Sequence, residues 1–323
     1  MGKIIDALKV ARGDVPELVL RSLEDTEDRV AERTQRPANG KPRVQTLPVR
    51  VSDDPADRDA GTAAAAAVET NLEPAYPETG GRGDLRVRRL TLTVSDTVPL
   101  LSSAQERPYV AEQYRVLRTR ILQHSAKPAI LALSSPGIGD GKTVTAVNLA
   151  AAFAMNSEDQ ILLIDADLRC SAVHTYLRVP NTPGLSEVLA GTASFEEAAF
   201  RVGQIPSLCV LPAGEPGANA TELLSSSRWA TLLKTMRERF QRVIVDCPPV
   251  EAVADYDIIA AMCDGVIMVV RPDRTNRSLA LRALAKTRAK SLGVVINGAN
   301  DRALPKQYLS RYHTRTQKEK DGQ

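Results

Sequence analysis

The sequence predicts an α/β fold in which a mostly parallel sheet is covered by helices on both faces. Short apolar runs alternate with helix-forming segments along the chain, as parallel strands joined by right-handed crossovers require. Hydrophobic residues make up 43% of the 323 residues but aromatic residues only 4%, so the core consists of Val, Ile, Leu and Ala. That composition is typical of strands buried on both faces.

The chain divides into four segments. Residues 1–34 are expected to form short amphipathic helices, either a frayed terminus or a docking helix for a partner or membrane surface, and the sequence favours neither. Residues 35–84 are rich in Pro, Gly, Ala, Asp and Arg, which predicts a disordered linker. Residues 85–303 form the folded domain. Residues 304–323 form a polar, flexible tail that carries Tyr308 and Tyr312.

Within the folded domain, apolar runs and helical periodicity place the elements. An edge strand is expected within residues 85–94, and further strands at 130–133, 161–164, 208–211, 242–245, 265–270 and 293–296. Helices are expected at 109–123, 144–155, 220–240 and 276–290.

A glycine-rich turn at residues 134–143 follows the 130–133 strand and opens a helix, which predicts a phosphate-binding loop. The strict pattern asks for glycine where this chain has Pro136, but the strand–loop–helix context favours the assignment. Lys142 is expected to face solvent and reach the outer phosphates of a nucleotide, and the Thr143 hydroxyl to bind Mg²⁺. The predicted nucleotide-binding residues of this stretch are Gly137, Gly139, Asp140, Gly141, Lys142, Thr143 and Val144.

Acidic residues follow two of the predicted strands, at the edge where parallel α/β sheets bind ligands. Asp165 and Asp167 stand two apart, so in extended geometry both face the same phosphate and metal. A pair suggests one carboxylate for Mg²⁺ and one to orient or deprotonate an attacking hydroxyl. Asp246 has the placement of a metal- or water-holding acid. Arg169 is expected to approach phosphate or to pair with these acids.

Composition excludes several classes of protein. The net charge of +3 gives no argument for nucleic-acid binding. The four cysteines lack CxxC spacing, which favours reduced core thiols over a zinc site or disulfides. No apolar run approaches the roughly 20 residues of a membrane-spanning helix, so we expect a soluble, cytoplasmic protein.

Three charged residues lie at helical spacing on the first helix of the domain: Glu112, Arg115 and Arg118. Such a stripe is usually a solvated helix face, and less commonly an intersubunit ion-pair surface.

Residues 105–315 closely resemble the bacterial tyrosine kinases of exopolysaccharide and capsule assembly, which are P-loop kinases. The resemblance rests on residues 134–143, on Asp165-Ala-Asp167-Leu-Arg169, on Asp246-Cys-Pro-Pro249 and on the Glu112–Arg118 segment. Ile138 and Cys247 depart from the family pattern, and the tail has two tyrosines where the family has a cluster.

The resemblance implies a fold of the MinD/ParA-like type and an ATP- and Mg²⁺-dependent protein tyrosine autokinase. Asp165 would orient or deprotonate the tyrosine hydroxyl, with Asp167 and Asp246 serving Mg²⁺. Subunits would pack into a homo-oligomeric ring and phosphorylate Tyr308 and Tyr312 in trans. Stand-alone members pair with a membrane-anchored, Wzz-like polysaccharide chain-length regulator, which would activate this chain at the inner face of the cytoplasmic membrane.

Two alternatives remain open. One is a ParA/MinD-type ATPase, although those proteins carry a signature lysine where this chain has Gly137. The other is a nucleotide-binding scaffold of the polysaccharide machinery with little catalysis, which the sparse tyrosine tail leaves open.

Overall fold

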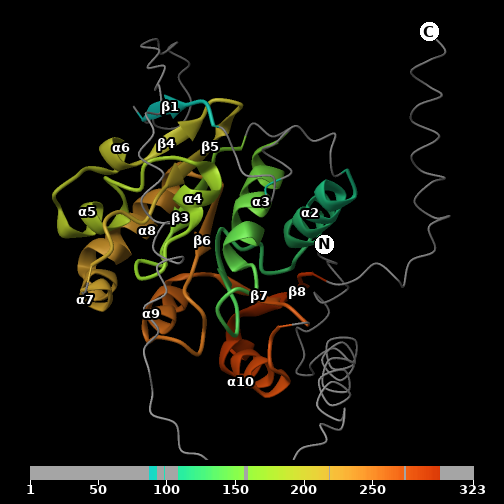
Figure 1. The fold of residues 1–323 in the computed structure, drawn as a ribbon. Coiled ribbons are helices and arrows are strands. Elements are labelled where there is room, and N and C mark those ends of the chain that lie inside the picture. The colour runs from blue at the N-terminus through green and yellow to red at the C-terminus, as the bar shows by residue number, and fades with distance from the viewer. Residues whose placement is uncertain are drawn as a thin grey trace, which may run out of the picture.

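The computed structural model describes residues 87–92, 98, 108–155, 159–217, 219–272 and 274–298. The described residues form an eight-stranded sheet with helices on both faces, which confirms the predicted fold class (Figure 1). The predicted helices of 1–34, the 35–84 linker and the 304–323 tail lie outside the described residues.

The strand order is β1-β4-β5-β3-β6-β2-β7-β8. Every neighbouring pair is parallel except β4 and β5, which are antiparallel. The strands are β1 (Arg88–Leu90), β2 (Ile130–Ser134), β3 (Ile161–Asp165), β4 (Phe200–Val202), β5 (Ile205–Leu211), β6 (Arg242–Asp246), β7 (Gly265–Val270) and β8 (Ser291–Ile296).

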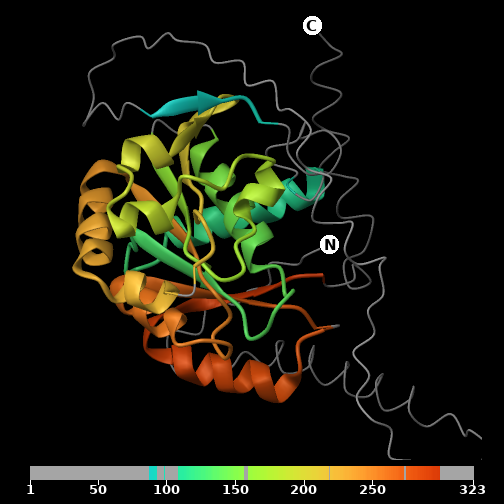
Figure 2. The same cartoon turned by 60° about the vertical axis from the view of Figure 1, so that its left-hand side comes forward.

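The helices fall into two layers, one on each face of the sheet (Figure 2). One layer holds α2 (Pro108–Leu122), α3 (Lys142–Ala154) and α4 (Val173–Leu177). The other holds α5 (Leu185–Ala190), α6 (Phe195–Ala198), α7 (Ala220–Ser225), α8 (Ser227–Arg239), α9 (Asp255–Met262) and α10 (Arg277–Thr287). A short 3₁₀ turn, η3 (Arg288–Lys290), follows α10. No described helix is both long and apolar enough to span a bilayer.

The central strands show why the sheet carries two cores. Alternate residues of β2 enter opposite clusters: Ile130 and Ala132 face the α8 side, whereas Leu131 and Leu133 face α3. All five residues of β2 are buried. The continuous apolar run is therefore required, because both faces of a parallel sheet are covered.

The structure differs from the sequence prediction in several features, among them the short helices α4, α5, α6 and α9, which were not predicted. The helix expected over 220–240 is two helices, because Ser226 has extended backbone (φ −70°, ψ 154°) and separates α7 from α8. Serine favours such a boundary position since it competes with helical hydrogen bonds. The antiparallel strand β4 was not predicted, because three residues are too few to show a period.

The expected edge strand is β1, and a side chain of the β4–β5 turn fastens the chain beyond it. The Gln204 amide accepts a hydrogen bond from the backbone N–H of Leu92 and donates one to its carbonyl, at 3.1 and 2.7 Å. The backbone N–H of Gly203 donates to Leu90 O. These contacts hold the short strand at the sheet edge despite the charge of Arg88 and Arg89.

Candidate nucleotide-binding site

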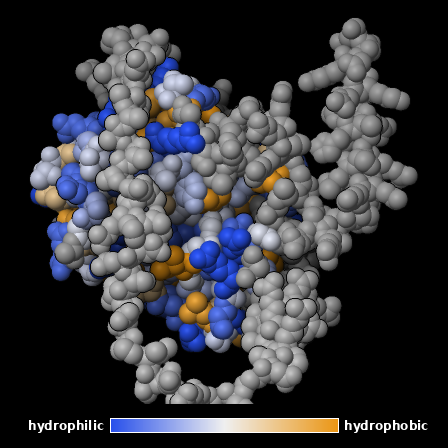
Figure 3. Space-filling model, in the orientation of Figure 1, coloured by the Kyte–Doolittle hydropathy of each residue, from blue (hydrophilic) through white to orange (hydrophobic). Residues whose placement is uncertain are grey.

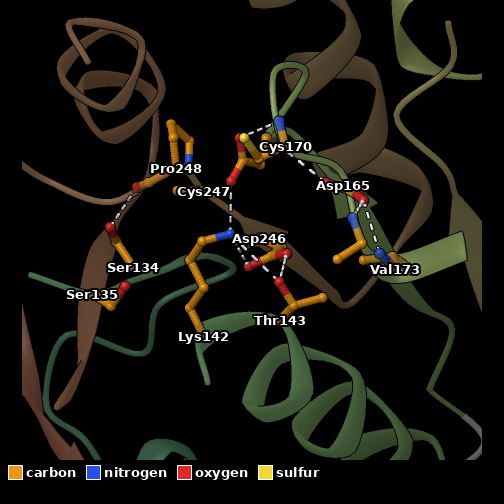
Figure 4. A network of polar contacts seen from close by, with 12 residues as sticks. Ser134, Ser135, Lys142, Thr143, Asp165, Cys170, Val173, Asp246, Cys247 and Pro248 are labelled. Carbon is orange, nitrogen blue, oxygen red and sulfur yellow. Dashed lines mark hydrogen bonds and ion pairs between the residues drawn. The ribbon is translucent and has the colours of Figure 1, made fainter. Parts of the chain in front are cut away.

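The predicted phosphate loop connects β2 to α3 at the carboxyl edge of the sheet. Figure 4 shows Lys142 and Thr143 at the end of this loop, beside Asp246. Strand register brings the acids to the same edge, because Asp246 pairs with Asp165 on one side and with Leu133 of β2 on the other. Gly141 has φ +96°, and a Cβ there would lie 1.9 Å from Asn297 Nδ2. Only glycine fits this position.

Asp140 shapes the loop rather than facing an open site. Its carboxylate accepts hydrogen bonds from the backbone N–H of Gly137 at 3.0 Å and from Thr275 Oγ1 at 2.7 Å. Its backbone carbonyl accepts one from Asn297 Nδ2 at 2.9 Å. Burial raises the pKa of Asp140, and these hydrogen bonds offset part of that effect. Thr275 and Asn297 were not predicted, since their only signal in the sequence is that they follow strand ends at this edge.

Lys142 is buried, so the expectation that it faces solvent is wrong. Its Nζ lies 2.7 Å from Asp167 Oδ2 and 3.8 Å from Asp246 Oδ1. Burial lowers the pKa of Lys142, but the negative charges of Asp246 and Asp167 outweigh burial and hold that pKa above its ordinary value. The lysine is therefore charged and engaged by carboxylates before any phosphate arrives.

Thr143 and Asp246 supply the oxygens expected for a cation. Thr143 Oγ1 donates to Asp246 Oδ2 at 2.6 Å, while the buried Asp246 Oδ1 has no hydrogen-bond partner. Among the described residues no group of three or more His, Cys, Asp or Glu could form a metal cage by itself. Mg²⁺ does not need one, since it commonly binds one or two protein oxygens together with substrate phosphates. The Thr143 hydroxyl and the Asp246 oxygen that accepts no hydrogen bond fit that ion.

The two acids at the end of β3 face different partners. Asp165 accepts hydrogen bonds from three backbone N–H groups, those of Asp167 at 3.2 Å, Ala172 at 3.1 Å and Val173 at 3.0 Å. Asp167 instead contacts Lys142 and accepts from the N–H of Cys170 at 3.1 Å. In this structure Asp165 therefore organises the turn that presents Asp167, and the pair does not converge on one point.

Arg169 contacts neither acid of the pair. Its Nε lies 2.7 Å from Asp255 Oδ2 on α9, and its Nη2 donates to Thr221 Oγ1 on α7 at 2.8 Å. Thr221 in turn donates to Asp255 Oδ1 at 2.6 Å. The arginine thus ties the turn after β3 to two helices, and the expectation that it pairs with Asp165 or Asp167 is not met.

The predicted charged stripe on α2 is split between two environments. Arg115 forms an exposed ion pair with Glu112 at 3.0 Å. Arg118 turns inward and donates from Nη1 to the backbone carbonyl of Ala152 at 2.9 Å, near the end of α3. Because a cation at a helix C-terminus satisfies free carbonyls there, Arg118 has a role within its own subunit.

The cysteines are unpaired thiols, as expected, but they are not all in the core. Cys209, Cys247 and Cys263 are buried, and burial raises the pKa of Cys209 to about 12. Cys170 is exposed in the turn beside Asp167, which corrects the prediction of a core position.

The buried acids predict a pH effect on stability. Burial, with the charge of Asp246, raises the pKa of Asp165 from 3.8 to about 8, and burial raises that of Asp246 to about 6. Both groups bind protons more tightly folded than unfolded. The nucleotide-free protein should therefore lose several kcal/mol of unfolding free energy as pH rises from about 4 to about 8.

Urea unfolding at several pH values, without Mg²⁺ or nucleotide, measures this slope. The Asp165→Asn variant should show a flatter slope between pH 6 and about 8, where only Asp165 of the two still titrates. The exposed Asp257→Asn is the matched control and should keep the wild-type slope. A stability that rises over this window would contradict the assignment of raised pKa values.

The fold and the site define a P-loop nucleotide-binding protein, and residues 129–287 match the family model described as an AAA domain. The tyrosine-protein kinase YwqD of Bacillus subtilis (strain 168) is 37% identical over 195 residues, covering 58% of this chain and 81% of that protein. The tyrosine-protein kinase ptk of Acinetobacter johnsonii is 34% identical over 234 residues, 72% of this chain but only 31% of that protein.

Solved structures agree with these relatives. The VpsO kinase domain superposes with a TM-score of 0.55 at 32% identity, covering 61% of this chain and 98% of that one. The kinase domain of the Escherichia coli tyrosine kinase ETK superposes with a TM-score of 0.57 at 30% identity, covering 64% and 82%. The chain belongs to the bacterial tyrosine kinase family and is a protein-tyrosine kinase.

Proposed function

We propose that this kinase transfers the γ-phosphoryl group of ATP to its own tail tyrosines and thereby regulates exopolysaccharide or capsule polymerisation. The observation that carries the proposal is the buried Asp246 Oδ1, which accepts no hydrogen bond and lies beside the Thr143 hydroxyl, 3.8 Å from the charged Lys142, at the end of the phosphate loop. A buried anionic oxygen that accepts no hydrogen bond and lies next to a hydroxyl suits the Mg²⁺ that accompanies ATP.

The contacts support a role for each polar side chain. Lys142 leaves Asp167 for the β- and γ-phosphates, whose charge competes for the ammonium group. Thr143 and Asp246 hold Mg²⁺, which when bound neutralises phosphate charge. Asp165 is saturated by backbone N–H groups, so its contacts support a positioning role rather than that of a base.

Asp167 is then the carboxylate available to the acceptor. Once Lys142 has turned to the phosphates, Asp167 can accept the proton of the tyrosine hydroxyl. The hydroxyl oxygen forms a bond to the γ-phosphorus while the bond from that phosphorus to the bridging oxygen breaks, and ADP leaves with the electron pair. This division differs from the one that the family resemblance implied, in which Asp165 took this role.

The acceptor and the assembly are proposed from the sequence. Tyr308 and Tyr312 lie outside the described residues, in a polar tail long enough to enter a neighbouring subunit. Glu112 and Arg115 are exposed on α2 and remain candidates for contacts between subunits of a ring. We further propose that a membrane-anchored, Wzz-like chain-length regulator activates the kinase through its cytoplasmic segment, which would place the kinase at the inner face of the membrane.

The tail is tested by the Tyr308→Phe/Tyr312→Phe double variant. Purified protein is incubated with ATP and Mg²⁺, with and without the cytoplasmic segment of the regulator, and phosphotyrosine is mapped by mass spectrometry. We expect the double variant to lose most of the phosphotyrosine signal, because the hydroxyl acceptors are gone while the site is intact. Tyr176→Phe, a tyrosine of α4, is the matched control and should keep the signal.

Each contrary result has a definite reading. A double variant as strongly phosphorylated as wild type would show that the tail is not the acceptor. ATP hydrolysis without any phosphotyrosine would favour the partitioning-type ATPase. Nucleotide binding without turnover of any kind would favour the scaffold.

A further inference from the structure

An arginine from the segment between β7 and α10 lies against the phosphate loop. A Cβ placed on Gly139 would lie 2.8 Å from Arg274 Cζ and 3.1 Å from both Nε and Nη1. Three such similar distances mean that the flat face of the guanidinium is turned toward Gly139. Since Gly139 also has φ +83°, only glycine lets the arginine come this close.

Side-chain hydrogen bonds fix the backbone on both sides of Arg274. The next residue, Thr275, donates from Oγ1 to Asp140 Oδ1 of the loop at 2.7 Å and accepts from the N–H of Arg271 at 2.9 Å. Asn276 caps α10 by accepting from the backbone N–H groups of its first turn. The backbone is therefore held beside the phosphate loop, and only the long side chain of Arg274 is free to turn.

The positive charge of Arg274 affects the phosphate-loop residue Asp140. The Arg274 side chain is exposed. Its positive charge, with that of Arg271, lowers the pKa of Asp140 and so offsets part of the effect of burial. Figure 3 shows a group of hydrophilic residues exposed on the face that carries α10. An exposed cation next to an anion-binding loop is well placed for a ligand that brings several negative charges.

Arg169, which the sequence analysis expected at the phosphates, is occupied elsewhere. Asp255 and Thr221 hold its guanidinium. These contacts hold the Arg169 guanidinium against α7 and α9 rather than at the phosphate loop. The position beside the phosphate loop is instead filled by Arg274, which lies about 130 residues after that loop in the sequence.

We propose that Arg274 is a nucleotide-binding residue whose guanidinium contacts the outer phosphates of ATP. Its planar array of N–H donors matches phosphate oxygens, and a short rotation of the side chain at the loop brings the donors to a ligand there. The inference rests on the proposed nucleotide site and adds to it a residue outside the family motifs.

Isothermal titration with ADP and with a nonhydrolysable ATP analogue, both with Mg²⁺, tests the contact. Arg274→Ala should bind the ATP analogue about tenfold more weakly, the loss expected for one charge-assisted hydrogen bond. Arg274→Lys should recover part of the affinity, because the charge remains while the planar array of donors is lost. The melting temperature without nucleotide should stay unchanged, as the side chain is exposed. Arg288→Ala, an exposed arginine of η3, is the matched control and should bind like wild type.

The outcomes separate this inference from the site assignment. Wild-type affinity in Arg274→Ala would overturn the contact, and so would an equal loss in Arg288→Ala, which would mark a general charge effect. A lowered melting temperature with no recovery in Arg274→Lys would make the arginine a structural support of the loop. Lys142→Met is measured in parallel: if it also binds like wild type, the nucleotide site itself is misassigned.

Discussion

Replacing Lys142 with methionine is expected to lower tyrosine phosphorylation by about 100- to 1,000-fold, the cost of removing one preorganised charge from a phosphoryl-transfer site. Methionine keeps the length of the side chain but cannot bind phosphate. The variant should also be less stable without nucleotide, because Asp167 loses its partner at 2.7 Å. Breaking a buried ion pair from one side costs about 3 kcal/mol. Phosphotyrosine blots and urea unfolding measure the two effects.

Lys234→Met is the matched control, since Lys234 is an exposed lysine in the middle of α8. It should keep wild-type phosphorylation and stability within about 0.5 kcal/mol. Lys142→Met with wild-type turnover would remove the phosphate-loop assignment. Full loss of activity with unchanged stability would mean that the ion pair to Asp167 contributes nothing to the folded state.

Replacing Asp246 with asparagine should change activity and stability in opposite directions. Activity should fall about 100-fold or more, because the buried anionic oxygen proposed for Mg²⁺ is lost. The nucleotide-free protein should become more stable by about 1–3 kcal/mol, since burial disfavours the charged carboxylate and raises its pKa to about 6. The asparagine oxygen can still accept the hydrogen bond from Thr143. Nucleotide affinity measured at increasing Mg²⁺ concentrations reports the loss of the cation site. Thermal unfolding without nucleotide reports the gain in stability.

Asp257→Asn is a suitable control, because Asp257 is exposed and forms a surface ion pair with Lys286 at 2.9 Å. It should change neither Mg²⁺ dependence nor stability by more than about 0.5 kcal/mol. Loss of stability in Asp246→Asn would indicate that the carboxylate is structural, and the cation site would then have to be sought elsewhere.

The parts of the site that follow from local sequence were predictable. A strand, a glycine-rich turn and a helix form one continuous stretch, so the phosphate loop and Thr143 could be located without knowledge of the fold. Asp165, Asp167 and Asp246 follow strands, and the carboxyl ends of parallel strands lie at one edge. The class of fold followed for the same reason, because the alternation of strands and helices is visible in short windows.

The parts that depend on contacts across the sheet were not predictable. Thr275 and Asn297 reach the phosphate loop from β7 and β8, and no spacing in the sequence reports that approach. Nor does any spacing in the sequence report that Asp255 binds the Arg169 side chain, so that Arg169 does not pair with Asp165 or Asp167. The burial of Lys142 was missed because a loop lysine is ordinarily exposed, and only the register of β3 and β6 shows three carboxylates beside it.

The position of β2 also determines when the site can form during synthesis. This strand carries the phosphate loop, yet its neighbours in the sheet are β6 and β7, which lie more than a hundred residues later in the chain. Until β6 has left the ribosome, β2 has no strand to pair with, and its second edge is covered only when β7 follows. Such nonlocal pairing slows folding and leaves an apolar strand exposed to aggregation. The nucleotide site is thus encoded early and completed late, and the nascent chain must protect β2 in the interval.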